Sequence, residues 1–94
     1  MLAAITDYLI SEGFRADFMN SYSLGEDYII IDQDNPRCGN LIVEYGDDGW
    51  IVVRHPGIGT FGSKDVSVLL ADPNCLVNLV GTIRKVMDDV RKYY

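Results

Sequence analysis

Apolar side chains recur every three or four residues at both ends of the chain, which is the spacing of one face of an α-helix. At the N-terminal end the pattern stops before Gly13, the residue type that most often follows a helix. At the C-terminal end, Asp72 and Pro73 supply an N-cap followed by proline at the first helical position. The sequence therefore predicts a helix from Leu2 to Glu12 and a longer, one-sided helix that begins at Asp72. The apolar positions of the two helices are Leu2, Ile5, Leu9 and Ile10, and Leu76, Leu79, Val80, Ile83, Met87, Val90 and Tyr94.

Between the two helices, short apolar runs alternate with polar residues or are separated by turn-forming residues, as in β-strands. Gly46-Asp47-Asp48-Gly49 lies between two of these runs and predicts a β-hairpin. The segment 55–64 contains three glycines and one proline, so we expect a long loop there. The expected strands cover residues 14–19, 28–31, 41–45, 50–54 and 66–70.

A helix, five successive strands and a second helix favour an antiparallel meander with both helices against one face of the sheet. We therefore predict an α+β two-layer sandwich with the element order α-β-β-β-β-β-α. An alternative leaves residues 63–70 irregular and the sheet four-stranded. The 94 residues have room for a single domain, 1–94, and a hydrophobic fraction of 48% is enough for a packed core. A chain of this size leaves little room for a deep active-site cleft.

Charge and cysteine content narrow the expected partners and compartment. Fourteen acidic and eight basic side chains give a net charge of −6, which repels phosphate backbones, so we expect no nucleic-acid partner. The N-terminal segment lacks the basic start of a signal peptide, and no apolar run approaches the roughly 18 residues of a membrane span. Cys38 and Cys75 are too few for a disulfide scaffold. We therefore expect a cytoplasmic protein with free thiols and no membrane partner.

The strongest candidate for ligand chemistry is the glycine-rich segment after residue 56. Gly57, Gly59 and Gly62 match the G-x-G-x-x-G spacing that lets backbone amides approach phosphates. In dinucleotide-binding folds the third glycine opens a helix, whereas a strand-like run follows here, so a connecting loop is favoured and no cofactor is expected. The single histidine, His55, has no zinc-ligand spacing with either cysteine, so we expect no metal. A nucleophilic pair of Cys38 and His55 is conceivable but lacks a third group to orient it, and the sequence leans against an enzyme.

Strand alternation carried through the hairpin separates the two faces of the sheet, whether the turn takes two residues or four. We expect one set to lie in the core beneath the helices: Leu41, Val43, Tyr45, Trp50 and Val52, with Phe14, Ala16, Phe18, Ile29, Ile31, Val66, Val68 and Leu70. The other set, which includes Glu44 and His55, points away from the helices. Its apolar members form a patch that neither helix covers, unless the second helix crosses to that face and buries it. The apolar patch consists of Tyr28, Ile30, Ile42, Ile51 and Val53, with Met19 and Leu69 beside them.

An uncovered apolar patch with a charged rim typically marks an interface. We therefore expect an interaction or adaptor module that binds through Tyr28, Ile30, Ile42, Ile51 and Val53, with a second copy, another protein or both as the partner. Two alternatives remain open. One is an acidic inhibitor-like protein that occupies a basic site on another macromolecule. The other is a small enzyme or nucleotide-binding protein that uses the Gly57 to Gly62 loop and His55.

Overall fold

The fold is defined by a computed structural model that describes residues 2–20, 26–35, 37–57 and 62–92. Both predicted helices and all five predicted strands are present. In chain order the elements are α1 (Leu2–Ser11), β1 (Arg15–Asn20), β2 (Asp27–Asp32), β3 (Asn40–Tyr45), β4 (Trp50–His55), β5 (Lys64–Leu69) and α2 (Cys75–Arg91).

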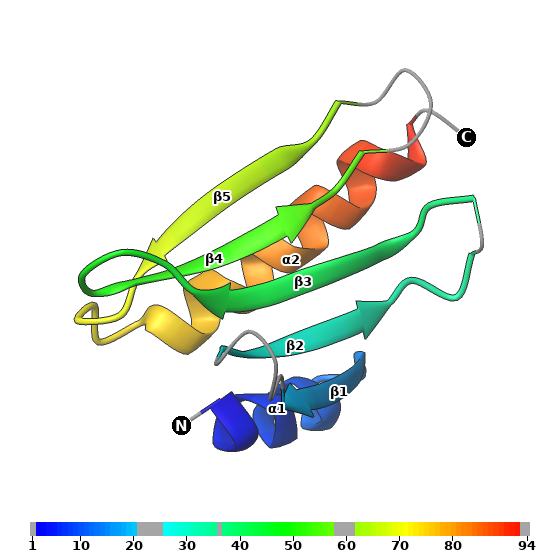
Figure 1. The fold of residues 1–94 in the computed structure, drawn as a ribbon. Coiled ribbons are helices and arrows are strands. Elements are labelled where there is room, and N and C mark those ends of the chain that lie inside the picture. Colours follow the sequence, from blue (N-terminus) through cyan, green and yellow to red (C-terminus); the bar gives the residue numbers. More distant parts are fainter. Residues whose placement is uncertain (1, 21–25, 36, 58–61, 93–94) are drawn as a thin grey trace.

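The five strands form one antiparallel sheet in which each strand pairs with its neighbours in sequence, in the order β1-β2-β3-β4-β5. α1 packs on β1 and β2, and α2 packs on β4 and β5. Both helices lie on the same side of the sheet, and Figure 1 views the molecule from the opposite side. The predicted α+β two-layer sandwich is confirmed with five strands. The alternative in which the second helix crosses to the other face is wrong.

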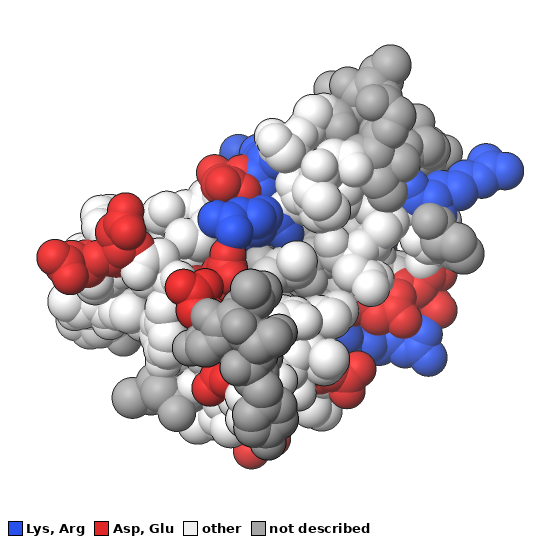
Figure 2. All heavy atoms as spheres, viewed as in Figure 1, with Lys and Arg blue, Asp and Glu red and all other residues white. Residues whose placement is uncertain are grey.

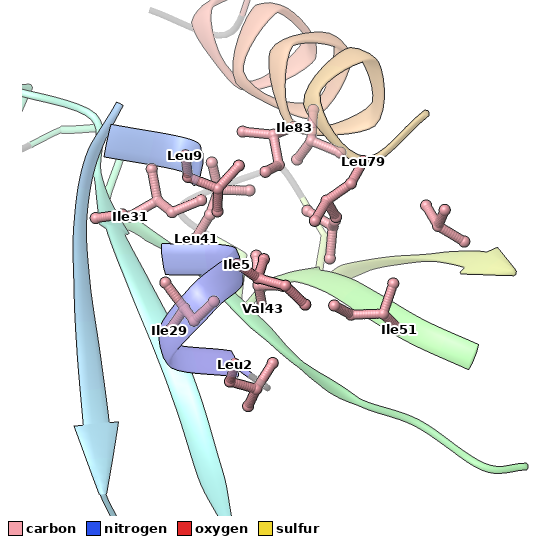
Figure 3. Packing of buried hydrophobic residues seen from close by; sticks show 14 of the residues in the cluster. Leu2, Ile5, Leu9, Ile29, Ile31, Leu41, Val43, Ile51, Leu79 and Ile83 are labelled. Carbon is pink, nitrogen blue, oxygen red and sulfur yellow. The ribbon is translucent and has the colours of Figure 1, made fainter. Parts of the chain in front are cut away.

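The hydrophobic core fills the space between the helices and the inner face of the sheet (Figure 3). α1 contributes three buried apolar side chains and α2 contributes four, of which Leu79, Ile83 and Val90 belong to the predicted apolar stripe. Burial of these aliphatic side chains is the main favourable contribution to folding. The buried members are Leu2, Ile5, Leu9, Ala16, Ile29, Ile31, Cys38, Leu41, Val43, Ile51, Val53, Val68, Leu79, Ile83, Val86 and Val90.

The apolar stripe predicted for α2 was wrong in detail, because Leu76 is 39% exposed and Val86, which was not expected in it, is buried. Ile10 of α1 is 51% exposed, and Tyr94 lies outside the described residues.

The β3–β4 hairpin has a loop of three residues, an odd number that the sequence interpretation did not consider. Tyr45 pairs with Ile51, and the N–H of Gly46 donates to the carbonyl of Trp50 at 3.0 Å. Residues 47–49 therefore form the loop, which is closed by a 3.0 Å hydrogen bond from the Trp50 N–H to the Asp47 carbonyl. Gly49 has a φ of +80°, which explains the glycine at this position.

Because the loop has an odd number of residues, each β4 side chain lies on the face of the sheet opposite to the one predicted. Ile51 and Val53 are fully buried in the core, so the prediction that they belong to the outward patch is wrong. Trp50 and Val52, which were expected in the core, point to the other face of the sheet. The physical reason is that one additional loop residue moves every side chain of the following strand to the opposite face.

Two further core predictions are wrong in detail. Phe18 and Tyr45 are on the inner face of the sheet but lie near its end, where they are 38% and 42% exposed.

α2 begins at Cys75 with Asn74 as its N-cap, rather than at Asp72. The Asp72 carboxylate instead accepts one hydrogen bond from the backbone N–H of Asn74 at 2.8 Å and one from the side-chain amide of Asn78 at 3.3 Å. These bonds stabilise the turn before the helix. Neither helix of the described chain is long and apolar enough to cross a membrane.

Candidate interaction surface

The sheet face opposite the helices, here called the open face, is covered by no helix or strand of the described residues. Three of the five predicted interaction residues, Tyr28, Ile30 and Ile42, lie on it as expected, because they alternate with buried core residues of β2 and β3. Ile51 and Val53 do not. The apolar residues at outward positions of the five strands are Met19, Tyr28, Ile30, Ile42, Trp50, Val52 and Leu69.

One row of side chains crosses the whole open face and shows how apolar and charged residues are distributed. Ile30 of β2 pairs with Ile42 of β3, so two isoleucines lie side by side at the centre. On one flank, Ile30 pairs with Asp17 of β1. On the other flank, Ile42 pairs with Arg54 of β4, and Arg54 pairs with Asp65 of β5. The centre of the face is therefore apolar and its margins are charged, which is the usual arrangement of a protein interface.

Two basic side chains that the described strands place on this face, Arg15 and Arg54, are engaged within the molecule. Arg54 donates to the carboxylates of Glu44 and Asp65, the latter with an Nε to Oδ1 distance of 3.0 Å. Arg15 forms an exposed ion pair with Asp34 at 2.6 Å. In Figure 2, which shows this face, residues other than Lys, Arg, Asp and Glu occupy much of the described surface, and the charged side chains lie in small groups, some of both signs and one of acids alone.

A hollow of about 640 Å³, here called the hairpin hollow, lies at the end of the open face beside the β3–β4 loop. Sequence reasoning missed it because Trp50 was assigned to the core. The indole of Trp50 is 42% exposed, whereas Val52 in the same hollow is only 8% exposed and forms part of the wall. Its lining consists of Glu26, Glu44, Tyr45, Gly46, Asp47, Trp50, Val52, Arg54 and Ser67.

His55 is fully buried and is held by backbone groups at the other end of the sheet. The N–H of Gly57 donates to its Nδ1 at 3.0 Å, so Nε2 carries the proton and donates to the carbonyl of Cys38 at 2.5 Å. The side-chain amide of Gln33 donates to the same carbonyl and to that of Gly39, each at 3.1 Å. These contacts join the end of β4 to the β2–β3 connection, which is a structural role.

The other ligand candidates of the glycine-rich segment are not brought together with a reactive group. Gly57 has a φ of +92° and leads out of β4, while Gly62 is exposed just before β5. Gly59 lies outside the described residues. The conceivable Cys38–His55 pair is joined through the backbone carbonyl of Cys38, and the thiol of Cys38 is fully buried.

An apolar pocket of about 460 Å³ opens between the two helices on the opposite side of the sheet. Cys75 lines this pocket, together with Ile5, Tyr45 and Leu76. Burial, and to a smaller extent the negative charge of Asp72, raises the pKa of the Cys75 thiol. The thiol is therefore protonated at neutral pH and behaves as a small apolar group.

Within the residues that the structure describes, no group of three or more His, Cys, Asp or Glu side chains is arranged to hold a metal ion. Comparison with protein-family models, with curated proteins and with solved structures finds no match for this chain. Among the described residues, the open face therefore provides the geometry and chemistry from which a function can be inferred.

Proposed function

We propose that this protein is a small interaction module that associates through the open face of its sheet, with a second copy of the chain as the simplest partner. The observation that carries the proposal is the central pair Ile30 and Ile42, which lies on a sheet face with no covering element among the described residues. Apolar patches with polar margins on small proteins commonly mark binding surfaces. A two-fold pair of copies needs only one such patch, because each copy contributes the same surface.

The charges at the margin support association in this place. Arg54 is neutralised by Glu44 and Asp65 within the same molecule, so a partner covers it together with its counter-charges. An ion pair that is already formed needs no new partner when a neighbouring apolar surface is buried, although its desolvation still has a cost. The apolar centre would then supply the favourable free energy and the charged margin the orientation.

The alternative hypothesis, that the protein is a small enzyme or binds a nucleotide, has less support. It needs His55 to face a ligand beside the glycine-rich loop, and His55 is fully buried with both ring nitrogens engaged by backbone groups. A nucleotide would also need backbone amides at a helix N-terminus, and the element that follows Gly62 is the strand β5. Unlabelled ATP and NAD, titrated against the amide signals of Gly57 and Gly62, should produce no saturable shift.

The homodimer is tested by sedimentation of the wild type and of Ile42→Asp. The wild type is expected to sediment as a dimer that dissociates on dilution, and Ile42→Asp as a folded monomer, because the new carboxylate would be buried without a partner. Val77→Asp is the matched control, since Val77 is 64% exposed on α2, on the helix side of the sheet. A wild type that is monomeric at every concentration would reject self-association. Equal dissociation of both variants would place the interface elsewhere.

A further inference from the structure

The hairpin hollow has an excess of negative charge. Three acidic side chains, Glu26, Glu44 and Asp47, line it, against the single base Arg54. Glu44 is bound to Arg54, but Glu26 and Asp47 form no ion pair with any described residue. Arg54 also binds Asp65 next to the hollow, so its charge is shared between two carboxylates. The hollow therefore favours a cationic group and disfavours an anionic one.

One aromatic side chain lies among these acids. The indole of Trp50 is 42% exposed and contributes to the lining, whereas Tyr45, which borders the hollow, has its side chain on the helix side of the sheet. The face of an indole ring attracts cations more strongly than any other side-chain ring, and arginine is the cation most often found against it. The wall formed by Val52 excludes water from one side of the same space. An aromatic face, two unpaired carboxylates and an apolar wall together suit a planar guanidinium group.

We infer that the hairpin hollow binds a basic segment of a partner protein by accepting an arginine side chain against Trp50, with its guanidinium between Glu26 and Asp47. This inference rests on the proposed association through the open face, of which the hollow is one end, and it names a basic partner protein distinct from a second copy of this acidic chain. The net charge of −6 draws a basic segment toward the protein at long range. Arginine is preferred to lysine because its planar group stacks on the indole while its edges donate hydrogen bonds to carboxylates.

Trp50 is the only tryptophan of the chain, so its fluorescence reports directly on the hollow. The probe is a capped hexa-arginine peptide, titrated at low ionic strength and again at about 0.15 M salt, where charges more than about 8 Å apart are screened. A saturable change in Trp50 fluorescence is expected, with capped hexa-lysine about threefold weaker because the stacking contribution is lost. The absence of a saturable change at low salt, or equal affinity for the two peptides, would overturn the inference.

Site-specific binding must be separated from general attraction to an acidic protein. The double variant Glu26→Gln, Asp47→Asn removes two negative charges at the hollow, and Asp7→Asn, Asp88→Asn removes two exposed charges from α1 and α2. We expect the first to weaken hexa-arginine binding at least tenfold and the second by no more than about twofold. Equal weakening by the two double variants would overturn the inference, because the peptide would then be attracted by the overall negative charge of the protein and not by the hollow. Trp50→Leu, followed by calorimetry, should weaken binding about threefold or more.

The same measurements show whether the arginine-site inference or the homodimer proposal has failed. A protein that sediments as an Ile42-dependent dimer but binds neither peptide saturably overturns the arginine site and leaves the dimer. A monomeric wild type whose peptide binding depends on Glu26 and Asp47 rejects the dimer and supports the arginine site. Circular dichroism of each variant verifies that the exposed substitutions leave the fold intact.

Discussion

Val43 and Val53 lie directly opposite each other on β3 and β4, and both side chains are fully buried beneath the helices. The pairing fixes the facing of the whole hairpin, because every second residue on each strand then points to the same side. Ile42, the neighbour of Val43 in sequence, consequently points to the open face. Ile42 and Val43 are both aliphatic and adjacent in sequence, yet one lies on the open face and the other in the core.

This relationship predicts opposite effects for two substitutions by aspartate. Val53→Asp should unfold the protein, because it would leave an unpaired carboxylate in the core. Ile42→Asp should retain the fold, since its side chain is on the open face. The mild truncation Val43→Ala should lower the free energy of unfolding by about 2 kcal/mol through loss of buried methyl groups. Thermal melting and urea unfolding measure all three, and a Val53→Asp protein as stable as wild type would contradict the facing of β4.

Gly46 should resist substitution by alanine, because its backbone lies against Val52. A Cβ at position 46 would be 2.7 Å from Cγ2 of Val52, and the branched valine side chain has little freedom to move away. Gly46→Ala is therefore expected to lower the free energy of unfolding by about 1 to 3 kcal/mol.

Gly81 provides the matched control for this substitution. It lies exposed within α2, and no atom is within 4 Å of the position a Cβ would occupy. Gly81→Ala should raise the free energy of unfolding by about 0.5 to 1 kcal/mol, because alanine favours the helix. Urea unfolding of the two alanine variants should therefore show shifts of opposite sign, and shifts of the same sign would contradict the close approach of Gly46 to Val52.

The ion pair between Lys64 and Asp89 should make stability depend on pH in the acid range. Lys64 Nζ of β5 is 2.5 Å from Oδ2 of Asp89 on α2, and this hydrogen bond lowers the pKa of Asp89 below its ordinary value of 3.8. The folded state therefore favours the carboxylate, so the contribution to stability is complete above pH 3.8 and is lost as the pH falls through the lowered pKa. Lys64→Gln should raise the pKa of Asp89 toward 3.8 and reduce the acid-range slope of stability.

Carboxyl NMR titration and urea unfolding between pH 2 and 5 measure the two effects of Lys64→Gln. Lys85→Gln is the control, because Lys85 makes the smallest contribution among the lysines that lower the pKa of Asp89. An equal rise of the Asp89 pKa in both variants would show that the hydrogen bond to Lys64 is not the dominant cause.

The two thiols should differ in their reactivity. Cys38 is fully buried and Cys75 is partly exposed, and burial raises the pKa of Cys75 above its ordinary value of 9.0. Iodoacetamide should modify Cys75 slowly at pH 7 and progressively faster as the pH rises through 9, because only the thiolate reacts. Mass spectrometry identifies the modified residue, and both cysteines should react in denaturant. Modification of native Cys38 at the rate of Cys75 would contradict the burial of the β2–β3 connection.

The hairpin shows where sequence reasoning was limited. Gly46-Asp47-Asp48-Gly49 correctly indicated a hairpin, but a loop of two or four residues gives one facing of β4 and a loop of three gives the other. The hydrophobic pattern of β4 could not decide between them, because Trp50, Ile51, Val52 and Val53 are all apolar. The hairpin hollow was missed for the same reason, since its tryptophan was assigned to the core.

The sequence alone determined the class of the fold, because helical periodicity, strand alternation and turn residues are local signals that each element carries in its own residues. It also determined three of the five outward residues, Tyr28, Ile30 and Ile42, because β2 and β3 alternate clearly. Only the tertiary structure decided that Val53 and His55 are buried and that Trp50 lines a hollow beside Glu26. These facts depend on strand register and on contacts between residues far apart in the chain, for which a single sequence contains no local signal.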